Sequence, residues 1–299
     1  MKHASPSVRP VFAILLGATS WGILWYPFRA IEAAGVPSPV STVFAYLVAT
    51  TLGGIVLRHT WREFPANARW LFVIGLTAGI TNVSYLVAIV QAEVLRIVLL
   101  FYLAPLWTVP LSRFVLHERL TISGYAVMLL ALAGAVVMLW RPELGLPAPR
   151  NIYEWLGLMA GFTFAACNVF VKAATKASPE AKSLAGSIGV FLVALPVAVF
   201  FSPAIGAWPA LASPHALLLV AIGITLFSTS VALQYGLSHL EANRAAVIML
   251  FELVVAAVAA HYLAGEASRL QDWLGGAMII AAGLISTMAE SRMKKNKRT

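Results

Sequence analysis

The tetrapeptides "EVLR" (93–96) and "EANR" (241–244) repeat the same two charges at the same spacing, 148 residues apart. Each lies between two long apolar runs, and a lone glutamate follows each arginine by 22 residues, Glu118 in the first case and Glu266 in the second. Charged residues make up only 11% of the chain, so the recurrence of this pattern is informative. It indicates an internal duplication.

The composition around these stretches is typical of an integral membrane protein. Of the 299 residues, 60% are apolar, whereas a soluble domain is about 45–50% apolar and about 25% charged. Apolar runs recur from end to end, and a helix that spans a bilayer needs about 20 apolar residues. The first run (11–28) holds Trp21 and Trp25 and lacks a convincing cleavage site, so we expect a retained helix and not a signal peptide.

Cytoplasmic loops and a basic tail explain the net charge of +9 better than nucleic-acid binding does, so no nucleic-acid partner is expected. The basic tail "RMKKNKR" (292–298) is the kind of segment that anionic leaflets attract. Cys167 is the only cysteine and can form neither an intrachain disulfide nor a metal cluster, so we expect no metal and no cofactor. Membrane lipids and a small-molecule substrate are the expected partners, and the choice between monomer and oligomer stays open.

Apolar runs bounded by charge, proline or glycine predict ten transmembrane helices. The expected spans are 11–31, 40–58, 70–90, 95–114, 121–140, 153–174, 183–201, 215–237, 243–263 and 272–289. The longest polar interval, "RPELGLPAPRN" (141–151), lies at the midpoint of the chain. It divides the chain into a first repeat of five helices (1–145) and a second (146–299).

The distribution of Lys and Arg predicts that both termini are cytoplasmic, because cytoplasmic loops are enriched in these residues. With ten spans, 16 of the 21 basic residues fall on the inside: Lys2, Arg9, Arg58, Arg62, Arg69, Arg113, Arg119, Lys172, Lys176, Lys182, Arg244, Arg292, Lys294, Lys295, Lys297 and Arg298. The other 5 fall outside: Arg29, Arg96, Arg141, Arg150 and Arg269.

This orientation places Arg96 and Arg244 on opposite faces of the membrane, so the second repeat is predicted to be inverted relative to the first. The predicted fold class is therefore an all-α membrane protein, with ten transmembrane helices in two inverted five-helix repeats around a central cavity. Inverted repeats are typical of secondary transporters, whose substrate site lies near the midplane. The repeated charges also have a structural interpretation: Glu93, Arg96, Glu241 and Arg244 anchor helix ends at the interface, and Glu118 and Glu266 close the turn before the last helix of each repeat.

The ordered combination of several short motifs resembles the EamA-type branch of the drug/metabolite transporter superfamily. These are "SWG" (20–22) in the first helix, and "LHE" (116–118) and "AGE" (264–266) before the last helix of each repeat. Gly134 and Gly283 follow 16 and 17 residues after those glutamates. The resemblance implies a cavity lined by helices 1, 3, 4, 6, 8 and 9, with helices 5 and 10 peripheral. Within the branch, the chain is most similar to a bacterial inner-membrane exporter of aromatic and other neutral amino acids.

Four polar side chains inside the spans are candidate substrate-binding groups. Glu252 is the carboxylate expected at mid-depth, where a charge requires a partner, water or a function. It could meet a substrate ammonium or titrate during transport, or it could be a neutral acid hydrogen-bonded between helices. Asn82, Asn168 and Gln234 cannot face lipid, so they bind substrate or hold helices together.

Seven aromatic side chains are further candidates for the cavity wall: Trp21, Trp25, Tyr85, Phe101, Tyr102, Trp107 and Tyr235. Trp21, Trp25 and Phe28 share a helical face at spacings of i, i+4 and i+7. Such a stripe could stack on a substrate ring or pack against neighbouring helices. Kinks that suit gating are expected at Pro27, Pro105, Pro110 and Pro196. One departure from the family is Leu253, which stands where many relatives have proline, and this leaves the bending of the ninth helix open.

The leading function is export of small neutral or aromatic amino acids, or related hydrophobic metabolites, across the bacterial inner membrane by alternating access. The alternative is export of another small metabolite or a cationic drug. Phosphorylated substrates would need interior Lys or Arg, which the sequence does not place at mid-depth. The chain is not expected to be an enzyme, because it has neither an "HExxH" motif nor a Walker loop and its only aspartate is Asp272.

Overall fold

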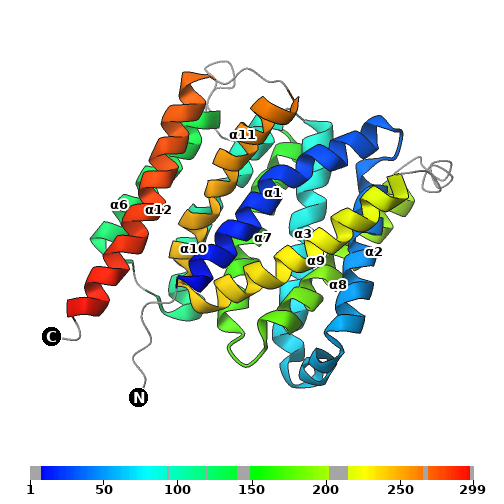
Figure 1. Ribbon diagram of the computed structural model, residues 1–299, viewed down its shortest axis with the longest axis horizontal. Helices are drawn as coiled ribbons and strands as arrows, with labels where there is room; N and C mark the ends of the chain where they lie inside the picture. The colour runs from blue at the N-terminus through cyan, green and yellow to red at the C-terminus, as the bar shows by residue number, and fades with distance from the viewer. Residues whose placement is uncertain are drawn as a thin grey trace.

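The computed structural model describes residues 8–92, 94–118, 120–139, 149–201, 215–264 and 269–296. Within these ranges the chain is almost entirely helical and has no β-strand (Figure 1). The elements are α1 (Arg9–Ala33), α2 (Ser38–Val56), η1 (Arg58–Glu63), α3 (Phe64–Gln91), α4 (Val94–Phe101), α5 (Ala104–Leu111), η2 (Ser112–Leu116), α6 (Ile122–Leu139), α7 (Ile152–Ala173), α8 (Pro179–Phe201), α9 (His215–His239), α10 (Ala242–Met249), α11 (Phe251–Ala264) and α12 (Leu270–Asn296).

The predicted helical membrane fold is confirmed. Nine helical segments of the described chain are long and apolar enough to span a membrane, and α12 contains a tenth, shorter apolar segment. Three of the nine combine several elements: Arg58–Ala88 holds η1 and most of α3, Ile97–Leu116 holds most of α4 with α5 and η2, and Ala242–Leu263 holds α10 and most of α11. The last two contain a break between α-helices. Because α3 already begins at Phe64 and α12 continues to Asn296, these two helices extend beyond their predicted spans of 70–90 and 272–289.

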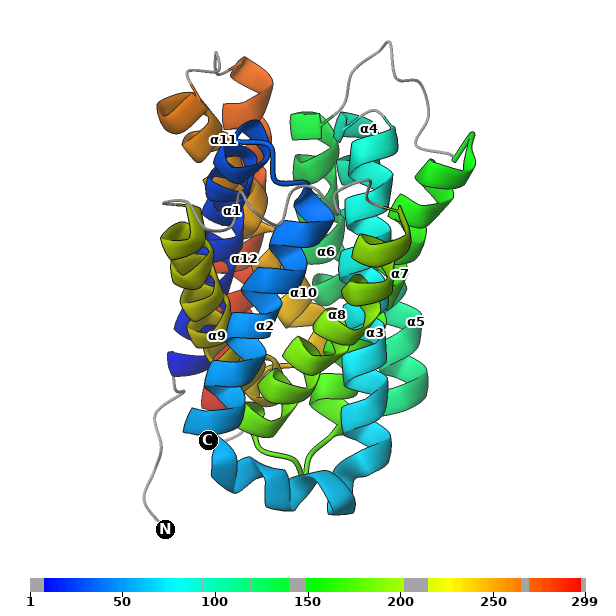
Figure 2. The ribbon, with the colours of Figure 1, turned by 90° about the vertical axis from the view of Figure 1, so that its right-hand side faces the viewer.

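Helices that are equivalent in the two halves run in opposite directions. In Figure 2, α1 begins at the lower end of the bundle and rises, whereas α7 begins at the upper end and descends. The start of α1 and the end of α12 lie at the same end of the bundle (Figures 1 and 2). This is the arrangement expected when a unit with an odd number of crossings is duplicated.

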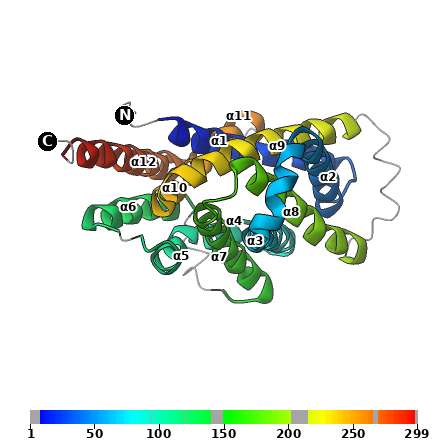
Figure 3. The ribbon, with the colours of Figure 1, turned by 90° about the horizontal axis from the view of Figure 1, so that it is seen from below.

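Equivalent helix pairs form between the two halves. α3 packs along α7 and α8, and its counterpart α9 packs along α1 and α2. α6 and α12, the last helices of the two halves, pack against each other at one side of the bundle (Figure 3). Helices 5 and 10, which were expected to be peripheral, are thus packed together as a pair with one helix from each half.

Two glycines separated by 148 residues permit equivalent close approaches. A Cβ added to Gly75 on α3 would lie 2.7 Å from the carbonyl oxygen of Ala185 on α8. A Cβ added to Gly223 on α9 would lie 2.7 Å from the carbonyl oxygen of Ala45 on α2. Small residues let helix backbones approach closely within a bilayer, so both halves use the same packing device.

The fourth span is interrupted after Phe101, where α4 ends and α5 begins at Ala104. Pro105 has no N–H to donate to the carbonyl of Phe101, so the regular helical bond is lost at this point. Beside the break, Leu103 N bonds to the carbonyl three residues earlier, Leu100 O, at 3.4 Å. The interruption is therefore encoded locally.

The ninth span is interrupted at Leu250, between α10 and α11. Leu250 stands 148 residues after Tyr102, so the two interruptions are equivalent. Leu253 N bonds to Leu250 O at 3.1 Å, which tightens the turn. The ninth span is thus interrupted here without a proline.

The four candidate kink prolines have different surroundings. Pro105 lies in the first turn of α5, beside the interruption, and Pro110 lies inside α5, shortly before the π-helical turn η2. Pro27 and Pro196 lie inside α1 and α8, each of which continues as a single helix. Only the prolines of the fourth span accompany a change of helix type.

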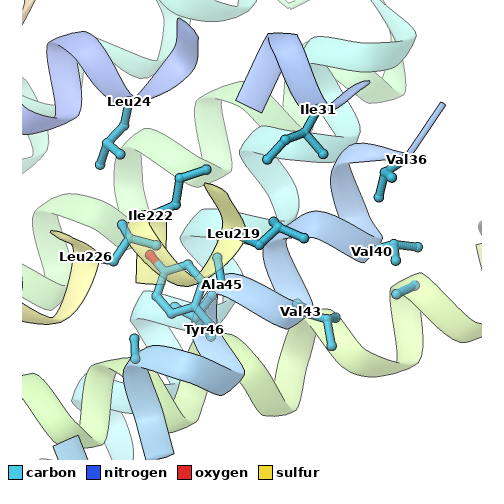
Figure 4. Close-up of a cluster of buried hydrophobic side chains, with 14 residues drawn as sticks. Leu24, Ile31, Val36, Val40, Val43, Ala45, Tyr46, Leu219, Ile222 and Leu226 are labelled. Atoms are coloured by element: carbon cyan, nitrogen blue, oxygen red, sulfur yellow. The ribbon is translucent and has the colours of Figure 1, made fainter. Parts of the chain in front are cut away.

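Three clusters of buried apolar side chains surround the middle of the bundle. The first joins α1, α2, α8 and α9, and Figure 4 shows its side chains from α1, α2 and α9 together with Tyr46. The second joins α1, α3, α7, α8, α9 and α10. The third joins α4, α6, α10, α11 and α12. Each cluster contains side chains from both halves.

Candidate functional site

A cavity of about 170 Å³ lies between the two halves. Its wall consists of side chains from α1, α2, α3, α4, α7, α8, α9, α10 and α11 and from the α4–α5 junction: Trp21, Tyr46, Ala78, Thr81, Asn82, Tyr85, Phe101, Tyr102, Phe164, Cys167, Asn168, Gly186, Ser187, Val190, Leu226, Ser230, Leu233, Gln234, Leu237, Met249 and Glu252. All six helices named by the family resemblance contribute, together with α2 and α8, which the sequence did not suggest. No described residue of α6 or α12 takes part.

Glu252 lies at the start of α11, directly after the interruption of the ninth span. Its carboxylate accepts a hydrogen bond from the hydroxyl of Tyr102, which lies in the interruption of the fourth span. Tyr85 on α3 lies close enough to interact electrostatically with Glu252. The two equivalent helix breaks are therefore joined across the cavity by a carboxylate and a phenol.

The three candidate amides have different partners. Asn82 accepts a hydrogen bond from the hydroxyl of Tyr46 (3.3 Å) and donates to the carbonyl of Ala78 (3.0 Å). Asn168, which is 6% exposed, donates to the thioether sulfur of Met249 (3.6 Å), a weak acceptor. Gln234 is also buried, and its side-chain oxygen has no hydrogen-bond partner.

An aromatic cluster forms one side of the cavity. The ring of Phe101 lies 4.9 Å from that of Tyr85, 5.3 Å from that of Tyr102 and 5.2 Å from that of Phe164, measured between centroids. Tyr85 lies on α3, Phe101 at the end of α4, Tyr102 in the helix break and Phe164 on α7. Rings from three helices and the break therefore converge. The indole of Trp21 completes the aromatic part of the wall from α1.

Three aromatic candidates lie away from the cavity. Trp25 packs edge-on against Tyr26. Trp107 makes an edge contact with Phe162 on α7. Tyr235 stacks on His239 one turn further along α9. Since consecutive helical positions point about 100° apart, Tyr235 faces away from the cavity that its neighbour Gln234 enters.

Several wall residues were missing from the sequence prediction: Tyr46, Thr81, Phe164, Cys167, Ser187, Ser230 and Met249. Some could have been found by extending helical faces from the predicted amides. On α7, Phe164 precedes Asn168 by four positions, and on α9, Ser230 precedes Gln234 by four positions. Tyr46 and Ser187 could not be found in this way, because no substrate-binding candidate had been placed on α2 or α8.

The cavity wall contains few charged side chains. Glu252 is its one ionisable carboxylate, and no Lys, Arg or His occurs among the described residues that line it. Buried anions need positive or multiple hydrogen-bonding partners. The wall therefore suits a neutral, zwitterionic or cationic solute better than an anion.

The comparison with protein families agrees with this architecture. The sequence profile of the EamA-like transporter family matches residues 8–140 and matches a second time at residues 151–288. The chain belongs to the EamA-like transporter family. The two matches cover most of each half, and members of this family are transporters rather than enzymes.

Two proteins that are similar in sequence to this EamA-like chain are described as transporters. An "Uncharacterized transporter" of Archaeoglobus fulgidus is 28% identical over 77% of this chain and 81% of its own length. An "S-adenosylmethionine uptake transporter" of Rickettsia prowazekii is 26% identical over 73% of this chain and 71% of its own length. A solved crystal structure superposes with a TM-score of 0.73 at 20% identity, covering 94% of this chain and 98% of the other, and this likeness shows the fold.

Of the charged residues that revealed the duplication, Glu118, Glu241 and Arg244 are described, and none of these three lines the cavity of the EamA-like fold. The side chain of Glu118 reaches the opposite half, where it accepts a hydrogen bond from Ala242 N (3.1 Å) at the start of α10. The turn before α6 is instead closed by the backbone, through Glu118 N and Ser112 O (3.2 Å). Glu118 therefore closes its turn through the backbone N–H, whereas its carboxylate contacts the other half. Glu93, Glu266 and the side chain of Arg96 lie outside the described residues.

Additional polar contacts tie the same end of the EamA-like bundle together. Asn243 on α10 donates to the hydroxyl of Ser112 (2.8 Å). Lys182 on α8 donates to the hydroxyl of Ser238 (2.8 Å), and Lys172 on α7 donates to its carbonyl (3.3 Å). These bonds, and the second apolar cluster beside them, connect α7, α8, α9 and α10 at the end where α1 begins.

Partial burial raises the pKa of Glu118 above its ordinary value. The N–H of Ala242 and the ammonium of Lys172 act in the opposite direction, whereas Glu241 adds to the increase. Burial is the largest of these effects. Removing a carboxylate from water disfavours its charged form, which is the physical cause of the increase.

Proposed function

We propose that this EamA-like protein exports small neutral or aromatic amino acids, or related hydrophobic metabolites, across the bacterial inner membrane by alternating access. The observation that carries the proposal is the mixed wall of the central cavity. It combines aromatic rings, amides, hydroxyls and a single carboxylate with no described cationic side chain. The distribution of Lys and Arg along the sequence supports a multi-pass orientation with both termini in the cytoplasm.

The wall can meet each part of an aromatic amino acid. The carboxylate of Glu252 complements an ammonium group, and Tyr102 holds that carboxylate in place. Amides and hydroxyls on α3, α8 and α9 supply donors for the substrate carboxylate. The rings around Phe101 offer a surface for stacking, and an aromatic pair contributes about 0.5–1.5 kcal/mol beyond burial.

The helix breaks support alternating access. Each lies beside the cavity in a different half, and Tyr102 and Glu252 connect them. Interrupted helices at the interface of two repeats are where secondary transporters place their substrate sites, and a rocking motion can open the site to either side. Substrate binding at this junction would therefore act on both halves together.

Transport into reconstituted vesicles tests the proposal. Labelled Trp or Phe should accumulate in vesicles that contain the protein and not in empty vesicles. Unlabelled neutral aromatic amino acids should compete, whereas sugar phosphates and nucleotides should not. Uptake that none of the amino acids reduces would reject amino-acid transport.

The dependence on ions requires its own measurement. We expect Trp transport to persist without an ion gradient, driven by the substrate gradient alone. Uptake with and without a pH step, in native protein and in Glu252→Gln, decides this point. A strict requirement for the step that the variant loses would assign proton coupling to Glu252.

A second candidate substrate class is a small organic cation. The lone carboxylate among aromatic rings is a suitable environment for a sulfonium or ammonium group. The Rickettsia prowazekii relative, which is described as an S-adenosylmethionine uptake transporter, adds support for a cationic solute. Stronger competition by S-adenosylmethionine than by Trp in the same vesicles would favour this class.

A further inference from the structure

The hydrogen-bonding state of the cavity wall distinguishes one side chain from the others. Tyr46 and Asn82 bond to each other, as do Thr81 and Thr163 (2.9 Å). On the opposite side, Ser230 accepts from Ser183 (2.9 Å). These groups already have partners within the protein.

Gln234 differs, because its side-chain oxygen is shielded from solvent and has no partner. The residue is 8% exposed and lies on the cavity wall. Among the described residues, Thr50, Trp107 and Asn243 also have a buried side-chain atom without a partner. None of these three lines the cavity. A buried acceptor without a donor is unfavourable, so a ligand that supplies the donor gains affinity.

The neighbours of Gln234 indicate what that donor is. Leu233 and Leu237 border it on α9, and neither supplies a charge. The carboxylate that attracts an ammonium group belongs to a different helix and is held by Tyr102. A neutral N–H or O–H, such as an indole nitrogen or a phenol, is therefore the matching group for an amide oxygen.

We propose that Gln234 is a specificity-determining residue whose side-chain oxygen accepts a hydrogen bond from a donor on the substrate side chain. This inference rests on the proposed transport of aromatic amino acids and specifies it. Among such solutes, Trp and Tyr, which carry a ring donor, are preferred over 1-methyl-tryptophan and Phe, which lack one. A site built to bond a substrate donor discriminates strongly against the analogue without it.

The test compares Trp with 1-methyl-tryptophan in vesicles that contain native protein or the Gln234→Leu variant. Native protein should transport Trp at least about tenfold more efficiently, expressed as kcat/KM, since one well-made hydrogen bond accounts for a factor of that order. In Gln234→Leu the two substrates should be transported equally. Gln234→Glu, which keeps an acceptor, should retain the preference. Asn82→Leu is the matched control, because Asn82 already has protein partners; it should change both rates by the same factor.

The possible results separate this inference from the proposed function. If native protein transports neither Trp nor Phe, the proposed function fails. If it transports both and treats Trp and 1-methyl-tryptophan alike, only the role of Gln234 fails. A preference that survives in Gln234→Leu also overturns this role. The ratio in native protein gives a decision even if that variant does not fold.

Discussion

The fourth and ninth spans form the same interruption from different sequences. In the first half, Pro105 removes the N–H that the carbonyl of Phe101 would otherwise bond. In the second half, the break at Leu250 occurs in a sequence of ordinary helix formers. The comparison shows that a proline accompanies the break in the first half but is not required for the break in the second, and Pro27 and Pro196 lie in helices that continue unbroken.

Beyond the local sequence, equivalent contacts from the opposite half lie beside both breaks. Gly161 on α7 lies against the carbonyl of Phe101, and an added Cβ would be 2.6 Å from that oxygen. Gly22 on α1 lies against the carbonyl of Glu252, where an added Cβ would be 2.9 Å away. In each half, therefore, the first helix presents a glycine to the broken helix of the other half. Tertiary packing favours the two breaks in the same way.

The largest expected effect comes from adding a side chain at one of these contacts. Gly161→Val should destabilise the protein by about 3 kcal/mol or more, because its atoms would overlap the backbone of α4. Gly283→Val on α12 is the control, since an added Cβ there meets nothing within 4 Å. Thermal unfolding in detergent measures both. Equal melting temperatures would show that the Gly161 contact does not support the break.

The next effect concerns the carboxylate that only the second half carries. Ala104 stands 148 residues before Glu252, so the first half has no equivalent acid. Glu252→Gln should lower kcat/KM for a substrate with an ammonium group about tenfold or more, as expected for a hydrogen bond to a charge.

Tyr102→Phe sharpens that comparison. It removes the hydroxyl that holds Glu252 but leaves the charge, so the loss of transport should be smaller than in Glu252→Gln. Initial rates in vesicles measure both variants. A larger loss in Tyr102→Phe would mean that the phenol, and not the carboxylate, binds the substrate.

A smaller effect is expected where the first half stabilises the second at one end of the bundle. Glu118→Ala should cost about 1 kcal/mol, as for loss of a helix cap, because Ala242 N would lose its acceptor. Glu118→Gln keeps an oxygen that can accept this bond and should be more stable than Glu118→Ala.

The pH dependence of Glu118 provides a further check. Because the folded protein raises its pKa, the neutral carboxyl is favoured on folding. The contribution of Glu118 is therefore fully present below its unfolded pKa and is lost as the pH rises through the folded pKa. Melting temperatures of native protein and Glu118→Gln should be measured from pH 4 to pH 8. The melting temperature of native protein, relative to that of the variant, should fall as the pH rises. The opposite trend would mean that the N–H of Ala242 outweighs burial.

The smallest effect should follow Leu253→Pro, which gives the second half the proline it lacks. Only the bond from Leu253 N to Leu250 O would be lost, in the first turn of α11, so the cost should be about 1 kcal/mol or less. Val258→Pro in the interior of α11 should cost about 3 kcal/mol. Unfolding of the two variants in parallel tests whether the break already exists at Leu250, since similar costs would contradict it.

Much of the fold could be predicted because the bilayer limits the possible structures. A chain with this many long apolar runs must form helices that satisfy their own backbone bonds in lipid. The candidate site was harder to predict. Asn82, Asn168 and Gln234 were found because amides avoid lipid, whereas Trp25, Trp107 and Tyr235 were included although aromatic rings are stable on either face of a helix.

The sequence by itself determined the helices, their approximate number and the duplication, since apolar length and scarce charges are local properties of the chain. Only the tertiary structure decided which faces of those helices meet. It brought Tyr46 and Ser187 to the cavity, directed Glu118 to the other half and placed Tyr102 against Glu252. The physical reason is that rotation of a helix about its axis depends on close packing with its neighbours, which single side chains do not specify.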